Sequence, residues 1–321
     1  MGAGNDIEND VWPASQPKLL HRYLTPVYDS ARWDRFQPRT GDIIVCTAPK
    51  CGTTWTQMLC ALLVHRSPEL PQPLTRLSRW LDRHTEPIED VVADFDAQSF
   101  RRIIKTHTPL DGLPYFENVS YVVCCRDPRD AFLSMVDHFH NISQKSLVEL
   151  AKRSDNRLKL PEDANEVFRL WLTRPSEAWT KDGFPFGSHT HFCSTYWAYR
   201  ILPNIFFLHY ADLIADLETE MRRLAEFLAI SIPETLWSEL VNAARFANMK
   251  DNATETAPGA HLGEWASERD FFRKARMGEW RNGLSQENQE LYDTLMRERL
   301  SPALRVWLEG GRAAAGDPKL I

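Results

Sequence analysis

Four short apolar runs recur along the chain, and each is followed by a polar or helical segment. They cover residues 42–47, 102–106, 121–125 and 205–209. Because these runs lack polar alternation, they predict strands buried on both faces, as in a parallel sheet. After the first run, one helix face is marked by Trp55, Met58, Leu59, Leu62 and Leu63. Strands alternating with helices predict an α/β fold, with a central parallel sheet flanked by helices.

The remaining segments predict further helices and loops. Helices are expected at 77–81, 88–95, from 127 onward, and at 141–160, 213–228 and 286–307. Segments 174–192 and 250–270 are expected to be mobile loops, the first because it is rich in Pro, Gly and aromatic residues. Residues 1–36 predict a loosely structured segment anchored by Tyr23, Trp33 and Phe36. Since neither a repeat nor a Ser/Gly linker occurs, residues 1–321 are expected to form a single domain.

The stretch from Pro49 to Trp55 follows the first strand directly and predicts an anion site. A glycine in such a loop lets the backbone turn and approach a ligand closely, and the N–H groups of the following helix favour an anion. Lys50 adds a positive charge, and Thr53 and Thr54 add hydroxyl groups. The usual NTPase loop places its lysine after a second glycine, whereas Lys50 precedes Gly52. An ordinary strand-to-helix turn is the alternative.

Four chemically useful side chains lie just beyond predicted strands. They are Lys50, His107, Arg126 and Tyr210. Ligands of open α/β sheets bind beyond the carboxyl ends of the strands, so these side chains are expected to converge on one site. Asp127 and Pro128 have the residue types of a helix start, and Ser134 follows on that helix.

Bulk composition excludes several classes of protein. The chain of 321 residues has a formal net charge of −6, which argues against nucleic-acid binding. No apolar run approaches the length of a membrane span, and the polar start of the chain does not resemble a signal peptide. The six cysteines sit mostly in apolar runs without Cys-x-x-Cys pairs, which is typical of buried, reduced thiols in a cytoplasmic protein.

Four motifs in order resemble the cytosolic-type sulfotransferases, which use 3′-phosphoadenosine 5′-phosphosulfate (PAPS). They are Pro49–Trp55, Lys105-Thr-His107, Arg126–Asp130 with Ser134, and Phe271–Lys274 with Gly278-Glu-Trp280. The resemblance runs from about residue 40 to residue 285. It is strongest to mycobacterial glycolipid-type sulfotransferases, through Asp42-Ile-Ile, residues 105–113 and His209-Tyr-Ala-Asp212. It implies a P-loop-like sulfotransferase fold.

The resemblance also implies a role for each matching residue. Residues 50–55, with Cys51 and Gly52, would form the 5′-phosphosulfate loop, in which Thr53 and Thr54 bind phosphate and Trp55 packs on adenine. Arg126, Ser134, Arg273 and Lys274 would bind the 3′-phosphate, Tyr210 would lie beside adenine, and Phe271, Phe272 and Ala275 would complete the donor site. His107 would be the catalytic base, with Lys50 and Lys105 stabilising the transferring group. The product would be 3′-phosphoadenosine 5′-phosphate (PAP), and no metal is required.

The sequence departs from the family pattern at several positions. Cys51 replaces the usual serine, and it is expected beside the phosphates, where nucleotide would protect it from alkylation. Ala275 replaces the usual glycine, and Ala244 and Arg245 replace small hydroxyl residues near adenine. The dimer motif of animal members is not evident in residues 284–289, so the oligomeric state, a homodimer included, stays open.

The same residues bear on two alternative functions and on the acceptor. A P-loop kinase would need a lysine after a second glycine and a carboxylate for Mg²⁺, and an inactive nucleotide-binding module would not need Lys50, Lys105 and His107. The pairs His138/His140 and His189/His191 lack further metal ligands. Aromatic segments 76–100 and 140–195 indicate a small-molecule hydroxyl acceptor that is amphipathic or aromatic, such as a glycolipid.

Overall fold

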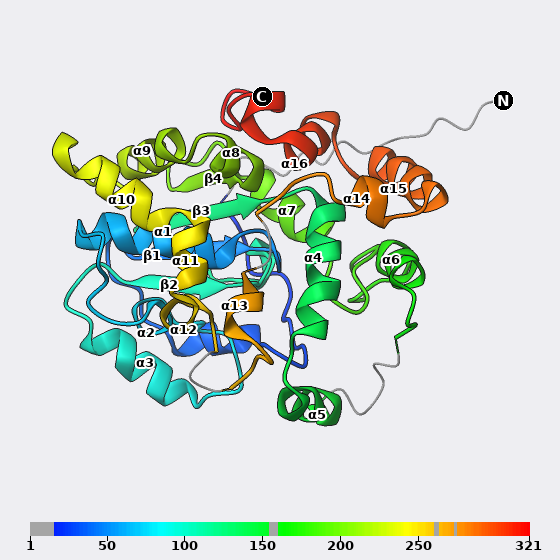
Figure 1. The fold of residues 1–321 in the computed structure, drawn as a ribbon, viewed down its shortest axis with the longest axis horizontal. Helices are drawn as coiled ribbons and strands as arrows, with labels where there is room; N and C mark the ends of the chain where they lie inside the picture. The colour runs from blue at the N-terminus through cyan, green and yellow to red at the C-terminus, as the bar shows by residue number, and fades with distance from the viewer. Residues whose placement is uncertain (1–15, 154–159, 260–262, 273–274) are drawn as a thin grey trace.

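A parallel sheet forms the centre of the molecule (Figure 1). The structure is a computed structural model that describes residues 16–153, 160–259, 263–272 and 275–321. Within these residues the sheet has the strand order β2-β1-β3-β4. The strands are β1 Ile43–Thr47, β2 Ile103–Thr106, β3 Ser120–Cys125 and β4 Ile205–His209. The expected fold class is confirmed.

The register of the sheet brings all four carboxyl ends to one edge. Ile43 lies opposite Ile103 on one side and Ser120 on the other, and Tyr121 lies opposite Ile205. Since all neighbours are parallel, the residues that follow each strand emerge together. The strand order therefore places β1 and its following loop between the ends of β2 and β3.

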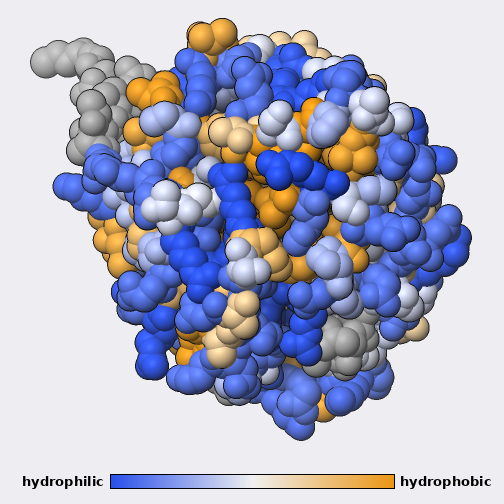
Figure 2. Space-filling model, turned by 90° about the vertical axis from the view of Figure 1, so that its left-hand side faces the viewer, coloured by the Kyte–Doolittle hydropathy of each residue, from blue (hydrophilic) through white to orange (hydrophobic). Residues whose placement is uncertain are grey.

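Alternate residues of the strands feed two separate hydrophobic cores, which explains the continuous apolar runs. In β1, Ile44 and Cys46 join the first core, and Ile43 and Val45 join the second. The first core packs against α3, α4, α6, α7, α15 and α16, and the second packs against α1, α2, α9, α10, α11 and α12. The face drawn in Figure 2 is mostly hydrophilic, with hydrophobic residues gathered near its middle.

The helices have the following bounds. They are α1 Thr53–His65, α2 Leu74–Leu77, α3 Ile88–Ala97, α4 Pro128–His140, α5 Gln144–Arg153, α6 Ala164–Thr173, α7 His189–Trp197, α8 Tyr210–Ala215, α9 Leu217–Phe227, α10 Trp237–Ala244, α11 Phe246–Asp251, α12 Ala253–Thr256, α13 Glu268–Phe271, α14 Trp280–Gly283, α15 Gln286–Arg299 and α16 Pro302–Ala315, with 3-10 helices η1 Ser30–Arg35, η2 Leu110–Gly112 and η3 Glu234–Leu236. Helix α4 begins as expected, because the Asp127 side chain accepts a hydrogen bond from the backbone N–H of Arg129.

Two of the expected long helices are each divided in two. The helix expected at 213–228 is interrupted at Asp216, whose carboxylate caps α9 by accepting from the N–H of Thr219. The helix expected at 286–307 ends at Arg299, and α16 starts after a Ser301 cap with Pro302 in its first turn. Proline lacks the N–H that would continue the preceding helix, so the break is a local effect of sequence.

The helix expected at 77–81 is wrong. Helix α2 ends at Leu77, and the chain then runs beside the sheet edge. The N–H of Lys105 donates to the carbonyl of Arg79 at 2.9 Å, and the N–H of Leu81 donates to the carbonyl of Lys105 at 3.3 Å. These bonds to β2 hold Trp80 next to Lys105, and no local pattern predicts them.

The expected loops contain regular structure as well. Segment 174–192 includes the start of α7, and segment 250–270 includes α12 and most of α13.

The expected anchors Tyr23, Trp33 and Phe36 are confirmed, since their exposed fractions are 3%, 1% and 3%. No helix in the described part of the chain is both long enough and apolar enough to cross a membrane.

Candidate functional site

The loop between β1 and α1 is shaped by two left-handed residues. Lys50 has φ 68° and Gly52 has φ 95°, and Gly52 directly precedes the first helical residue. Thr53, Thr54 and Trp55 occupy the first turn of α1, where backbone N–H groups have no acceptor within the helix. The loop therefore aims helix N–H groups and the start of the helix dipole at the sheet edge, as an anion site requires.

Replacing Gly52 with alanine is expected to lower the free energy of unfolding by about 1–3 kcal/mol. A Cβ atom there would lie 2.9 Å from Cδ2 of Tyr210, and the residue would keep a positive φ. Urea unfolding measures the effect. The control is Gly263→Ala, where φ is +66° but no atom of the described residues lies within 4 Å of the added carbon. Equal losses in the two variants would contradict the steric role of Tyr210.

His107 lies directly after β2 and is held in one tautomer. Its Nδ1 lies 2.7 Å from the carbonyl oxygen of Thr47, which accepts only, so Nδ1 carries the proton and donates. The lone pair is therefore on Nε2. Burial lowers the pKa of His107 well below its usual range, and the charges of Lys105 and Lys50 lower it further. A neutral imidazole with a free Nε2 lone pair is the form that a general base needs.

Lys105 reaches the same place from within β2. Its Nζ lies 4.1 Å from the ring centre of Trp80, whose ring also meets His107 edge-on at 4.7 Å. Burial lowers the pKa of Lys105 to about 7, with a contribution from the charge of Arg83. The ammonium group is thus held in a place where a negative ligand would favour its charged form.

Lys50 approaches from the β1–α1 loop. Its Nζ lies 3.2 Å from Nδ1 of His138 on α4 and 4.7 Å from the ring centre of Phe271. Burial lowers the pKa of His138 well below its usual range, and the charge of Lys50 adds to the effect. The neutral imidazole can therefore accept a hydrogen bond from the lysine and position it.

Arg126 lies at the end of β3 and connects two loops. Its Nη1 donates to the carbonyl of Lys50 and its Nη2 to the carbonyl of Arg276, each at 3.1 Å. The guanidinium group lies 4.3 Å from the ring centre of Tyr210. Its Nε is buried and has no hydrogen-bond partner in the described part of the chain. Such a group costs free energy unless a ligand satisfies it.

Aromatic rings form a wall beside Arg126. Trp55 donates from Nε1 to the carbonyl of Ala244 at 2.8 Å, and its ring meets Tyr210 at 5.5 Å and Phe246 at 6.2 Å. Phe246 in turn meets Phe272 at 5.8 Å. These rings offer flat, apolar surfaces of the kind on which a nucleobase stacks.

One cavity of about 820 Å³ joins these groups. The expected site residues that line it are Lys50, Gly52, Thr53, Thr54, Trp55, Lys105, His107, Arg126, Ser134, Tyr210, Phe271, Phe272 and Ala275. The cavity therefore brings the loop lysine, the imidazole and the strand-end arginine together, as the strand ends predicted. Arg273 and Lys274 lie outside the described residues.

Comparison with known proteins identifies the family. A sequence model of the family named Sulfotransferase domain matches residues 40–303. The chain belongs to this sulfotransferase family. It is 38% identical over 308 residues to a glycolipid sulfotransferase of Mycobacterium bovis, covering 90% of this chain and 94% of that protein. It is 24% identical over 294 residues to human sulfotransferase 1E1, covering 87% of this chain and 91% of that protein. The resemblance expected from the motifs is confirmed.

Solved structures of sulfotransferases share the fold. Mouse sulfotransferase SULT7A1 complexed with PAP is similar with a TM-score of 0.63 at 22% identity, covering 88% of this chain and 93% of that one. Retinol dehydratase in a complex with retinol and PAP is similar with a TM-score of 0.67 at 20% identity, covering 86% and 87%. At these identities the likeness concerns the fold.

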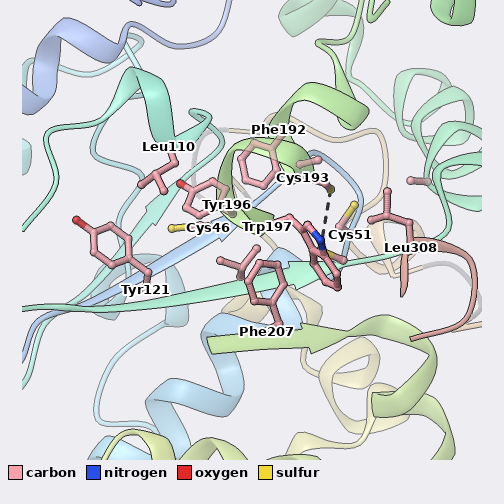
Figure 3. Close-up of a cluster of buried hydrophobic side chains, with 14 of the residues drawn as sticks. Cys46, Cys51, Leu110, Tyr121, Phe192, Cys193, Tyr196, Trp197, Phe207 and Leu308 are labelled. Atoms are coloured by element: carbon pink, nitrogen blue, oxygen red, sulfur yellow. Dashed lines mark hydrogen bonds between the residues drawn. The ribbon is translucent and has the colours of Figure 1, made fainter. Parts of the chain in front are cut away.

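The position of Cys51 in this sulfotransferase corrects one expectation. Its side chain is fully buried and joins the first hydrophobic core, where its Sγ lies 3.7 Å from Nε2 of His189. Figure 3 shows it among Cys46, Cys193 and aromatic rings. Burial raises the pKa of the Cys51 thiol, so the reactive thiolate is disfavoured. The side chain does not line the cavity, and the expected alkylation beside the donor does not follow.

Ala275 has a backbone conformation that is unusual for alanine. Its φ is 43°, in the left-handed region that glycine adopts most easily. The alanine therefore keeps the backbone conformation that glycine would favour, at a cost of about 1 kcal/mol.

Sequence reasoning missed three residues of this sulfotransferase site. Trp80, His138 and Phe246 contact Lys105, Lys50 and Trp55 respectively. Only the i, i+4 spacing from Ser134, which puts both side chains on one face of α4, gave a signal that His138 faces the cavity. Across the described ranges, no group of three or more His, Cys, Asp or Glu side chains is arranged so that it could hold a metal ion.

Proposed function

We propose that the protein transfers a sulfuryl group from PAPS to a hydroxyl group of an amphipathic acceptor, with His107 as the general base. The observation that supports this most is that one cavity is lined by Lys50, Lys105 and a neutral imidazole together with Arg126 and aromatic rings. Neither a redox centre nor a metal is needed for such a transfer.

The chain's own groups suit the donor at both ends. The first turn of α1 and Lys50 offer N–H groups and charge to the 5′-phosphosulfate. Arg126 and Ser134 line the same cavity and are assigned to the 3′-phosphate. That phosphate would accept a hydrogen bond from Nε of Arg126, a buried donor with no partner among the described residues. Trp55 and Phe246 would pack against adenine.

PAPS supplies an activated sulfuryl group whose bond to phosphate breaks as the acceptor oxygen bonds to sulfur. Nε2 of His107 takes the acceptor's hydroxyl proton, while the Thr47 carbonyl keeps the ring oriented. Lys50 stabilises the charge that develops on the leaving phosphate oxygen. Lys105 stabilises the negative charge on the oxygens of the sulfuryl group while that group passes from the phosphate to the acceptor. Positioning and charge stabilisation thus account for the reaction, as in phosphoryl transfer.

The apolar residues that line part of the cavity favour an amphipathic acceptor. Leu24, Ile142, Phe184 and Phe186 line the cavity together with polar groups, and Leu24 is 71% exposed. Mycobacterial relatives of this chain are named glycolipid sulfotransferases. A glycolipid has both the hydroxyl groups and the apolar chain that such a wall accommodates, whereas an aromatic alcohol would use only part of it.

The pKa of Lys105 predicts an alkaline limb in the pH profile. Lys105 is charged below about pH 7 and loses its proton above it, so kcat/KM for PAPS is expected to fall as pH rises through about 7. Lys105→Arg keeps its charge at every pH and should move the fall beyond about pH 9. Initial rates between pH 6 and 9 measure this, with Lys319→Arg as the control. A flat wild-type profile would contradict the role of the charge.

Transfer of labelled sulfate from PAPS to a mixture of alcohols, phenols and alkyl glycosides tests the function itself. Labelled product is expected without added metal, and ATP with Mg²⁺ is expected to yield no phosphorylated product. Phosphorylation would support a kinase instead. Tight PAP binding without any transfer would support an inactive nucleotide-binding module.

A further inference from the structure

The same cavity is lined by a second histidine, His191, whose ring contacts a carboxylate. Nε2 of His191 on α7 lies 2.9 Å from Oδ2 of Asp111 and 3.0 Å from the hydroxyl oxygen of Tyr23. The Tyr23 hydroxyl donates to Oδ1 of Asp111 at 2.8 Å and accepts from Nε1 of Trp179 at 3.1 Å. The three groups come from distant parts of the chain, and the donor site uses none of them.

The hydrogen bonds fix the tautomer of His191. A carboxylate only accepts, and the single proton of the Tyr23 hydroxyl already goes to Asp111. Nε2 of His191 must therefore carry the proton, which leaves the lone pair on Nδ1. The His191 side chain is 21% exposed and lines the cavity, whereas the Asp111 side chain is 4% exposed. Tyr23 also lines the cavity, but its hydroxyl proton is already given to Asp111, so His191 is the member of the cluster with a lone pair left for a ligand's hydroxyl.

The cluster is rigidly built. The carbonyl of Asp111 accepts from the N–H groups of Leu20 and His21 at 2.7 and 3.1 Å, which ties the N-terminal segment to η2. Gly112 leaves room for the Tyr23 ring, because a Cβ atom there would lie 2.4 Å from it. A rigid acceptor nitrogen loses little entropy when a ligand binds, and this favours specific recognition.

The loop that carries Asp111 is the same one that carries His107. Only three residues separate them, and both His107 and His191 line the one cavity. An acceptor with one hydroxyl at His107 can therefore present another hydroxyl toward the second histidine. A simple alcohol or phenol has no second hydroxyl group to place at His191.

We infer that His191, oriented by Asp111 and Tyr23, binds a second hydroxyl of the acceptor and so selects polyhydroxylated substrates such as sugars. The inference rests on the proposed function and names the substrate class for it. The hydroxyl donates to Nδ1 of His191, and the carboxylate of Asp111 strengthens Nδ1 as an acceptor through the bond to Nε2. His191 is thus a specificity-determining residue, and Asp111 and Tyr23 are positioning residues.

The test compares octyl β-glucoside with 1-octanol, which share the alkyl chain but differ in the sugar. The variant His191→Gln can still donate an amide N–H to Asp111 but has no acceptor nitrogen at the position of Nδ1. The ratio of kcat/KM for glucoside to that for octanol is expected to fall about tenfold. His140→Gln, at an exposed position at the end of α4, should leave the ratio unchanged.

Further readouts separate this inference from the proposed function and from a fold defect. Thermal unfolding and PAP titration check that His191→Gln folds and keeps its donor site. Suppose that the wild-type protein transfers label to both acceptors and that His191→Gln loses activity equally toward both, or toward neither. That result overturns the inference and leaves the proposed function standing. Failure of wild-type protein to transfer label to any acceptor overturns the proposed function as well. His191→Asn, whose amide can reach the Nδ1 position, should restore part of the ratio.

Discussion

Replacing His107 with asparagine is expected to lower kcat by about a hundred- to ten-thousand-fold, because the acceptor hydroxyl then loses its base. Asparagine is the sharper choice than alanine. Its amide N–H can still donate to the Thr47 carbonyl, which accepts from Nδ1 of His107 at 2.7 Å in the native protein. The loop after β2 should therefore keep its shape, and only the basic nitrogen at Nε2 is removed.

The measurements are single-turnover transfer of labelled sulfate and equilibrium binding of PAP. PAP affinity is expected to change little, since the imidazole is assigned to the acceptor and not to the nucleotide. His140→Asn, at an exposed position, is the matched control. A His107→Asn enzyme with near-normal kcat would eliminate His107 as the base.

Replacing Lys50 with methionine is expected to lower kcat by about a hundred- to a thousand-fold, the cost of removing one aligned charge from a transition state. Methionine keeps the length of the side chain and is no less suited than lysine to the φ of 68° at this position. The loop should therefore not gain strain. The contact of 3.2 Å from Nζ to Nδ1 of His138 would be lost with the charge.

The loss should appear in kcat more than in the KM for PAPS, since the charge on the leaving oxygen grows as the bond breaks. Lys319→Met is a suitable control, because Lys319 is exposed and lies against the ring of Phe227 near the C-terminus. An equal fall in both variants, or a fall confined to KM, would argue against stabilisation of the leaving group by Lys50.

The sheet and much of the site could be predicted from the sequence, because their signals are local. A short apolar run rich in β-branched residues, such as Ile43–Cys46, favours a strand covered on both faces, and the residue after such a strand lies at the ligand edge. The αL glycine, the helix start and the lysine of the loop all lie within a few residues of one another. His107 and Arg126 follow by the same rule from the next two strands.

What could not be predicted depends on contacts between distant segments. Trp80 reaches the site because residues 79–81 hydrogen-bond to Lys105, and nothing within 77–81 distinguishes that path from a helix. Phe246 meets Trp55 across nearly two hundred positions. Cys51 was misplaced for the opposite reason: its neighbours in sequence face the cavity, but its own side chain turns into the core. The breaks at Asp216 and Pro302 were, by contrast, readable as a cap and a helix stop.

The strand order has a consequence for how such enzymes can diverge. The groups assigned to the nucleotide come from the ends of β1, β3 and β4, whereas Tyr23 and His191 come from the segment before η1 and from α7. Substitutions that retune the second set leave the first undisturbed. Enzymes of one lineage can therefore change their hydroxyl acceptors through single substitutions while they keep binding the same sulfate donor.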